Sequence, residues 1–166
     1  MSDQLLEFKI PAPFIQRMAR LTPRELRYGY VHGWIDAEAV VQLCMGNIVP
    51  DDEQMAVVEA LALLLSDELD KVPDLIEQVV TDDRSVWVYL ALAFIHEHPS
   101  EFGDNPLQAV EMLYADFEYP SEMEPFVPFM PPPEGATPGA EGLEQRWQEY
   151  LHRQREKFLG RADRSY

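Results

Sequence analysis

Apolar residues recur at three- and four-residue spacing along most of the chain, and this spacing predicts amphipathic helices. The clearest helix start is Thr22-Pro23-Arg24-Glu25, a capping box with proline at the first helical position, which opens a helix ending near Gly33. A second helix is predicted to begin at Asp36 and to stop before Gly46-Asn47. By the same reasoning, further helices are expected over residues 50–65, 70–80 and 105–117.

The longest apolar stretch covers residues 85–95, where periodicity does not separate a buried strand from a buried helix. Its length, its alanine and leucine content and the following His96-Glu97-His98 favour a central helix. The stretch is about half the roughly 20 residues that a membrane-spanning helix requires. We therefore expect it to lie in the core of a globular domain.

Prolines change the pattern after Tyr119-Pro120 and confine the next segment to a short helical turn and extended chain. A loop is expected over residues 135–142, and an apolar stripe of Leu143, Trp147, Leu151 and Phe158 predicts a closing helix. The expected fold is a single compact all-α domain of six or seven helices, with a proline-rich segment before the C-terminal helix. The expected division is an N-terminal arm over 1–20, a helical domain over 20–158 with a proline-rich insert at 119–142, and a flexible tail over 159–166.

The charge is strongly negative and unevenly distributed. The 166 residues carry 13 Lys+Arg and 30 Asp+Glu, a net charge of −17. Acids and bases balance over residues 1–49, whereas residues 50–134 hold twenty acids against Lys71 and Arg84. Such an excess repels phosphate groups, so binding to nucleic acid or to an anionic membrane is not expected.

An acidic surface of this kind has two interpretations. It can serve solubility alone, or part of it can bind a basic protein partner. Residues 114–133 are the segment of most interest, because acids there surround aromatic side chains of the kind that anchor interfaces. The alternative is that these aromatic residues pack the proline-rich segment onto the core. The candidate partner-binding residues are Asp51, Asp52, Asp82, Asp83, Asp116, Glu118, Tyr119, Glu122 and Glu124.

Catalytic and metal-binding motifs are not evident. His96 and His98 point in different directions on a helix, so a metal ion is not expected there and a capping role is preferred. Cys44 lies on an apolar face with no nearby base, which favours a buried structural thiol. We therefore expect a non-enzymatic protein without a cofactor, the alternative being an enzyme whose site is assembled from distant segments.

The expected compartment is the cytoplasm. A single cysteine allows no intramolecular disulfide, and the first residues lack the basic and apolar regions of a signal peptide.

Three stretches resemble a bacterial family known only as the domain of unknown function numbered 2247. They are residues 21–36, residues 105–131 and the closing Trp147-Gln148-Glu149-Tyr150-Leu151, and the most specific part is Tyr-Ala-Asp-Phe-Glu-Tyr-Pro at residues 114–120. The resemblance covers roughly residues 20–155, and the prolines around 131–138 depart from it. It implies an immunity-like protein of polymorphic toxin systems and no catalytic residues.

Two functional hypotheses result. The first is a cytoplasmic, non-enzymatic immunity protein that binds and blocks a basic toxin domain, such as a nuclease, through its acidic middle segment. The second is a helical scaffold or adaptor that forms a homo-oligomer and is acidic only for solubility.

Overall fold

The computed structural model describes residues 8–49, 53–79, 83–102, 106–127 and 139–161. These ranges form eight α-helices and three short 3-10 helices, with no strand among them and one isolated parallel bridge between Leu21 and Ile48. The all-α class predicted from the sequence is therefore confirmed. The helices are α1 (Ala12–Met18), α2 (Pro23–Val31), α3 (Ala37–Cys44), α4 (Met55–Ala62), η1 (Leu69–Lys71), α5 (Val72–Ile76), α6 (Ser85–Glu97), η2 (Pro99–Phe102), α7 (Pro106–Asp116), η3 (Ser121–Phe126) and α8 (Gly139–Leu159).

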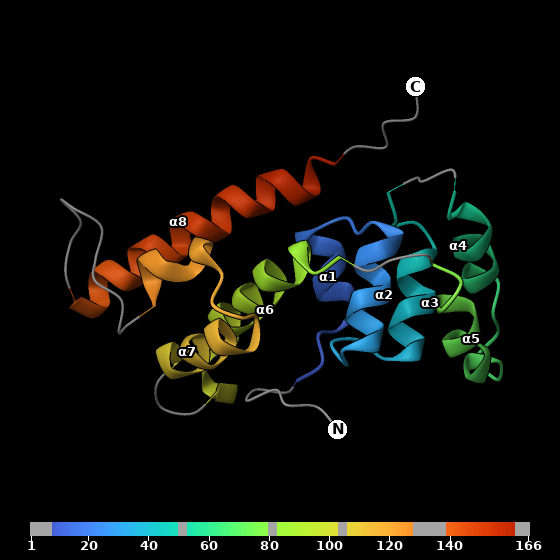
Figure 1. Cartoon of the computed structure of the whole chain (residues 1–166), viewed down its shortest axis with the longest axis horizontal. Coiled ribbons are helices and arrows are strands. Elements are labelled where there is room, and N and C mark those ends of the chain that lie inside the picture. Colours follow the sequence, from blue (N-terminus) through green and yellow to red (C-terminus); the bar gives the residue numbers. More distant parts are fainter. Residues whose placement is uncertain (1–7, 50–52, 80–82, 103–105, 128–138, 162–166) are drawn as a thin grey trace.

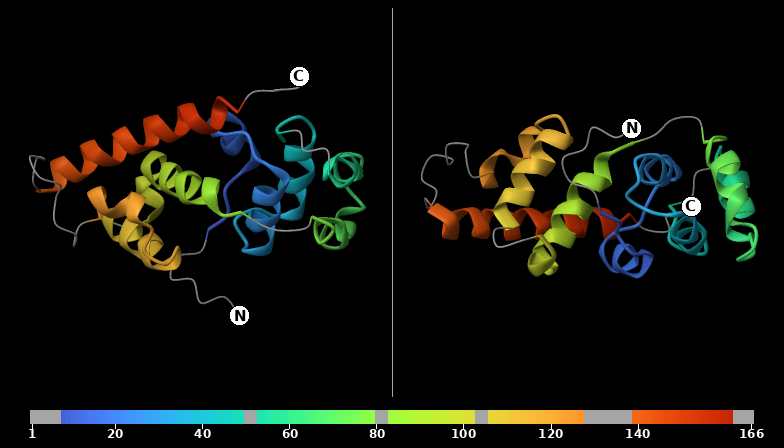
Figure 2. Two further views of the ribbon diagram at one scale, coloured as in Figure 1. Left: turned by 45° about the horizontal axis from the view of Figure 1, so that its top comes forward. Right: turned by 90° about the horizontal axis from the view of Figure 1, so that it is seen from below.

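The predicted central helix is α6. Every residue from Val86 to Ile95 is buried, and α6 packs against α1, α2, α7 and α8. Figure 1 shows α6 in the middle of an elongated molecule, with α4 and α5 at one end and α7 at the other. The longest helix, α8, runs from the α7 end past α6 to α1, which the two views of Figure 2 show from other sides.

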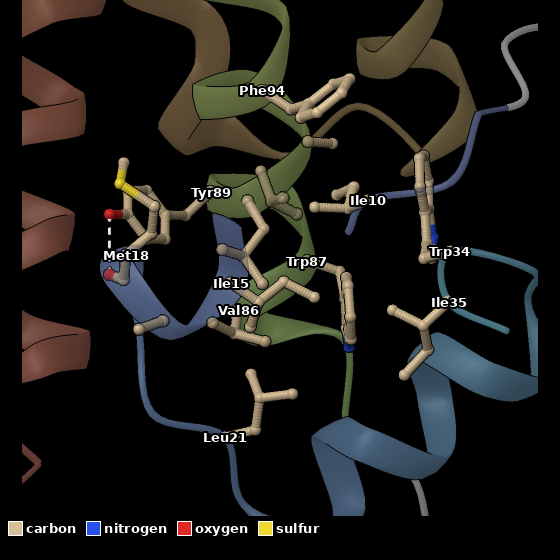
Figure 3. Close-up of a cluster of buried hydrophobic side chains, with 14 of the residues drawn as sticks. Ile10, Ile15, Met18, Leu21, Trp34, Ile35, Val86, Trp87, Tyr89 and Phe94 are labelled. Carbon is tan, nitrogen blue, oxygen red and sulfur yellow. Dashed lines mark hydrogen bonds between the residues drawn. The ribbon is translucent and has the colours of Figure 1, made fainter. Parts of the chain in front are cut away.

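Two aromatic residues of α6 direct their polar atoms to backbone carbonyl groups. Trp87 Nε1 donates to the Glu25 carbonyl oxygen at 2.6 Å, and the Tyr89 hydroxyl donates to the Met18 carbonyl oxygen at 2.9 Å. Figure 3 shows both rings among the aliphatic side chains of the core, with the Tyr89–Met18 bond drawn. The two bonds satisfy polar groups that would otherwise be costly to bury, and they tie α6 to α1 and α2.

The helix starts predicted from local capping signals are confirmed for α2 and α3. Thr22 and Glu25 form the reciprocal capping box, with bonds of 3.2 Å and 3.0 Å. The Asp36 carboxylate accepts from the backbone N–H of Ala39 at 2.8 Å and caps α3. Both caps involve residues three positions apart, which explains why the sequence alone locates them.

Other boundaries differ from the predictions. Helix α4 begins at Met55 rather than at residue 50, because the buried Gln54 takes the N-cap position and Glu53 lies in a turn before it. Helix α5 is shorter than the predicted 70–80 and follows the 3-10 turn η1. Helix α8 begins at Gly139, so residues 139–142 are helical where a loop was expected.

One helix lies within the segment expected as an N-terminal arm. Residues 12–18 form α1, which buries Phe14 and Ile15 and packs against α3, α6 and α8. The apolar spacing does not reveal it, because it spans only two turns and has Pro13 in its first turn. The division at residues 20 and 158 stays a prediction, and residues 162–166 of the expected tail lie outside the described ranges.

The described part of the proline-rich insert is anchored to the core. Met123 and Phe126 of η3 are buried, and the Phe126 ring lies 5.1 Å from that of Tyr150 on α8. The packing role considered for the aromatic residues therefore applies to Phe126, whereas Phe129 and the rest of 128–138 fall outside the described residues. Within the described ranges, each helix is too short or too polar to span a lipid bilayer.

Candidate protein-interaction surface

Five of the predicted site residues lie within nine positions, from the last residue of α7 to the middle of η3: Asp116, Glu118, Tyr119, Glu122 and Glu124. We call residues 116–124 the acidic turn. Its backbone is unusual, because Glu118 and Tyr119 both adopt the left-handed conformation, with φ of 60° and 61°. Two backbone bonds close the end of α7: Glu118 N–H donates to the Ala115 carbonyl at 3.0 Å, and Tyr119 N–H donates to the Tyr114 carbonyl at 2.7 Å. The left-handed region is unfavourable for residues with a side chain, so surrounding contacts must hold this conformation.

Those contacts come from Phe117 and Arg84. The Phe117 ring is buried and stacks on Trp34 at 5.7 Å, with the two rings almost parallel. The Arg84 guanidinium, at the start of α6, donates to the Phe117 carbonyl oxygen. The residue just before Glu118 is thus fixed through both its side chain and its backbone, which gives the acidic turn a defined shape.

The acidic turn directs Glu118 and Tyr119 toward solvent. The Tyr119 side chain is 62% exposed, and one edge contacts Tyr114 at a ring distance of 5.2 Å. Glu118 is exposed, and its carboxylate has no hydrogen bond or ion pair with any described residue. An exposed aromatic side chain beside an uncompensated carboxylate is suited to contact a basic surface.

Glu122 and Glu124, the two acids of η3, differ in their surroundings. Glu122 Oε2 accepts from the Tyr150 hydroxyl at 2.8 Å. Burial raises the pKa of Tyr150, and the charge of Glu122 raises it further, so the hydroxyl stays protonated and continues to donate. Glu122 therefore links η3 to α8, whereas Glu124 is half-buried and its carboxylate has no such bond to a described residue.

Most of the chain matches a known family pattern. The sequence pattern described as "Uncharacterized protein conserved in bacteria (DUF2247)" matches residues 12–155, well over half of the chain. The chain belongs to the DUF2247 family. No curated protein and no solved structure matches it. The family resemblance expected from the sequence is thereby confirmed at the level of an uncharacterised bacterial family.

Asp83 of this DUF2247 member lies at the start of α6. Its carboxylate accepts from the Ser85 backbone N–H at 2.9 Å and from the Ser85 hydroxyl at 2.6 Å. Partial burial raises the pKa of Asp83, but the bonds from Ser85 and the charges of Arg161 and Arg24 outweigh it and lower the pKa below its usual value. Asp83 thus stabilises the turn that leads into α6, and Asp51, Asp52 and Asp82 lie outside the described residues.

The histidine and cysteine candidates have separate surroundings. His96 Nε2 lies 2.7 Å from Glu144 Oε1, whereas His98, the C-cap residue of α6, has Nδ1 3.1 Å from the Phe94 carbonyl oxygen. In the described part of the chain, no three His, Cys, Asp or Glu side chains are grouped as metal ligands would be. Burial raises the pKa of Cys44 to about 12, so the thiol is protonated and a poor nucleophile at neutral pH.

Proposed function

We propose that this DUF2247 member is a non-enzymatic acidic protein that binds and blocks a basic protein, with the nuclease domain of a bacterial toxin as the expected target. The observation that carries the proposal is the acidic turn, which presents the 62% exposed Tyr119 beside Glu118, whose carboxylate has no ion pair with a described residue. Tyrosine is enriched among the residues that dominate interface energies, because it buries a large area at a low cost in conformational entropy.

The charge distribution supports a basic partner. Residues 50–134 contain twenty acids, and their two basic side chains are already engaged within the chain. Lys71 Nζ lies 2.7 Å from Glu68 Oε2, and the Arg84 guanidinium binds the Phe117 carbonyl oxygen. Glu97 of this region pairs with Arg17 from α1, but the acids still far outnumber the bases, and this excess would attract a cationic surface of another molecule.

Such a protein would act by electrostatic attraction followed by occlusion. The negative middle of the chain would accelerate encounter with a basic surface, and the acidic turn would then cover the part of that surface that contacts nucleic acid. We place this action in the cytoplasm, since the chain has a single cysteine and that cysteine is buried.

Capture from an extract of the encoding bacterium tests this proposal. The immobilised wild-type chain is compared with the double variant Glu118→Lys/Glu124→Lys, which leaves the Glu122–Tyr150 bond intact. A matched variant, Glu38→Lys/Glu156→Lys, changes the net charge equally at positions on α3 and α8. We expect wild type and matched variant to retain one basic protein that the acidic-turn variant binds about tenfold more weakly.

Two results would contradict the proposal. Equal capture by all three chains would remove the acidic turn from the interface. Recovery of only the bait itself would favour the alternative of a self-associating helical scaffold.

A further inference from the structure

A second unusual surface lies at the other end of the molecule. Leu63 and Leu65, directly after α4, are 78% and 64% exposed. Scattered exposed leucines are ordinary on protein surfaces, but two within three residues concentrate exposed apolar area in this loop, and we call these two side chains the patch. We call residues 53–79, which comprise α4, η1 and α5, the acidic hairpin. Its main contacts with the remaining helices are made through α3, and it lies at the opposite end from η3 (Figures 1 and 2).

The loop that carries the two leucines is held by its own hydrogen bonds. Glu68 Oε1 accepts from the Leu65 backbone N–H at 3.0 Å, and the Glu68 N–H donates to the Leu65 carbonyl at 2.8 Å. Lys71 Nζ in turn binds Glu68 Oε2 at 2.7 Å. These contacts favour a loop conformation in which the leucine side chains lie in solvent.

Acidic side chains outnumber basic ones around the patch. Leu63 N–H donates to the Glu59 carbonyl at 3.2 Å, so the Glu59 side chain lies one turn before Leu63 on the same helix face. Lys71, the one base of the acidic hairpin, forms an ion pair with Glu68. The exposed acids of the acidic hairpin with no ion pair to a described base are Glu59, Asp67, Asp70, Asp74 and Glu77.

We propose that the acidic hairpin is a second docking surface, and that its occupant is a cationic amphipathic segment of another protein. The apolar side chains of that segment would cover Leu63 and Leu65, while its lysine or arginine side chains would face Glu59, Asp67 and Asp70. A second copy of this chain is a poorer occupant, because two acidic hairpins would repel each other. The inference goes beyond the proposed function, since it concerns residues remote from the acidic turn.

A defined peptide tests the inference without knowledge of the natural partner. The probe is a short, dye-labelled helix of leucine and lysine with leucines at three- and four-residue spacing, and its control is the same composition in scrambled order. Fluorescence anisotropy gives the dissociation constants for the full chain and for Leu63→Ser/Leu65→Ser. We expect the variant to bind the amphipathic peptide about tenfold more weakly, and the wild type to prefer it over the scrambled peptide by a similar factor.

Matched variants separate this surface from general acidity. Val31→Ser removes another exposed apolar side chain, on α2, and should leave the dissociation constant within about twofold. Asp67→Asn/Asp70→Asn should weaken binding and reduce its salt dependence. Equal affinity of wild type and the leucine variant, or for both peptides, would overturn the inference. A wild-type dimer that the leucine variant converts to monomer in sedimentation would assign the patch to a second copy and overturn it as well.

Discussion

Gly29 of α2 lies directly against the ring of Trp87. A Cβ atom at this position would stand 2.1 Å from Trp87 Cζ2, and the ring has no room to shift because it is buried and bonded to the Glu25 carbonyl. Glycine to alanine normally stabilises a helix interior, but here the collision reverses the sign. We expect Gly29→Ala to lower the free energy of unfolding by about 2 kcal/mol or more, measured by urea denaturation.

The control for that prediction is Gly33→Ala. Gly33 has φ of +82°, and a Cβ atom added there would meet no described atom within 4 Å, so alanine introduces only backbone strain. Its expected cost is about 1 kcal/mol. A Gly29→Ala protein as stable as wild type would show that α2 and α6 are not packed this closely.

Cys44 makes stability depend on pH above neutrality. Burial raises its pKa from the usual 9.0 to about 12, so the folded chain keeps a proton that the unfolded chain releases. The stabilisation is fully present below pH 9 and is lost as pH rises toward 12, with a slope of roughly 1.4 kcal/mol per pH unit. Urea denaturation from about pH 8 to about pH 11 should show a shallower decline for Cys44→Ala than for wild type. Parallel curves would mean that Cys44 is accessible to solvent.

The acidic turn illustrates what can be predicted residue by residue. The acids and Tyr119 were identifiable because they cluster in the sequence. The exposure of Glu118 and Tyr119 could not be predicted, because it depends on the left-handed backbone at Glu118. That backbone is held by the stacking of Phe117 on Trp34 and by the bond from Arg84 to the Phe117 carbonyl oxygen. The surroundings of Glu122 were likewise not predictable, because its carboxylate binds the hydroxyl of Tyr150, which is distant in the sequence.

Among the elements, those with local start and stop signals were predictable. The caps of α2 and α3 and the apolar length of α6 gave correct helices, because each depends on residues within one or two turns. Helix α1 was missed because two turns give little periodicity and its stability derives from packing on α3, α6 and α8. Glu25 was predicted as a capping residue. Its ion-pair partner could not be predicted, because the partner is 136 positions away in the sequence.

That partner is Arg161, just after α8. Its guanidinium forms a two-pronged ion pair with the fully buried Glu25, in which Nη2 lies 2.8 Å from Oε2, and Nη1 also donates to the Arg20 carbonyl at 2.9 Å. Arg161→Ala would leave a buried carboxylate without its cation. We expect it to lower the free energy of unfolding by about 3 kcal/mol, measured by chemical denaturation.

Two further variants define the origin of that loss. Arg161→Lys keeps the charge but not the planar two-pronged geometry, so its cost should lie between wild type and Arg161→Ala. Arg155→Ala removes an exposed arginine of α8 and should change stability by less than about 0.5 kcal/mol. If Arg161→Ala unfolded at the wild-type denaturant concentration, α8 would not be fastened to α2 through this pair.

At the scale of the whole molecule, the negative charge is divided between two ends. The acidic turn lies near α7 and η3, and the acidic hairpin lies beyond α3 (Figure 1). Charge counts along the sequence located the acidic region over residues 50–134. They did not show that its acids lie at two ends of the molecule, because that separation comes from the buried helix α6, which connects the two ends. The partner proposed for the acidic turn and the segment proposed for the acidic hairpin would therefore contact opposite ends of the molecule.

The measurement that tests the central claim most directly is the salt dependence of the dissociation constant between the wild-type chain and the basic protein that it captures. We predict that affinity falls steadily as salt rises, and that Glu118→Lys/Glu124→Lys both weakens binding and flattens this dependence. The matched variant Glu38→Lys/Glu156→Lys should follow the wild-type curve more closely. A dissociation constant that is independent of salt and equal for all three chains would contradict the account.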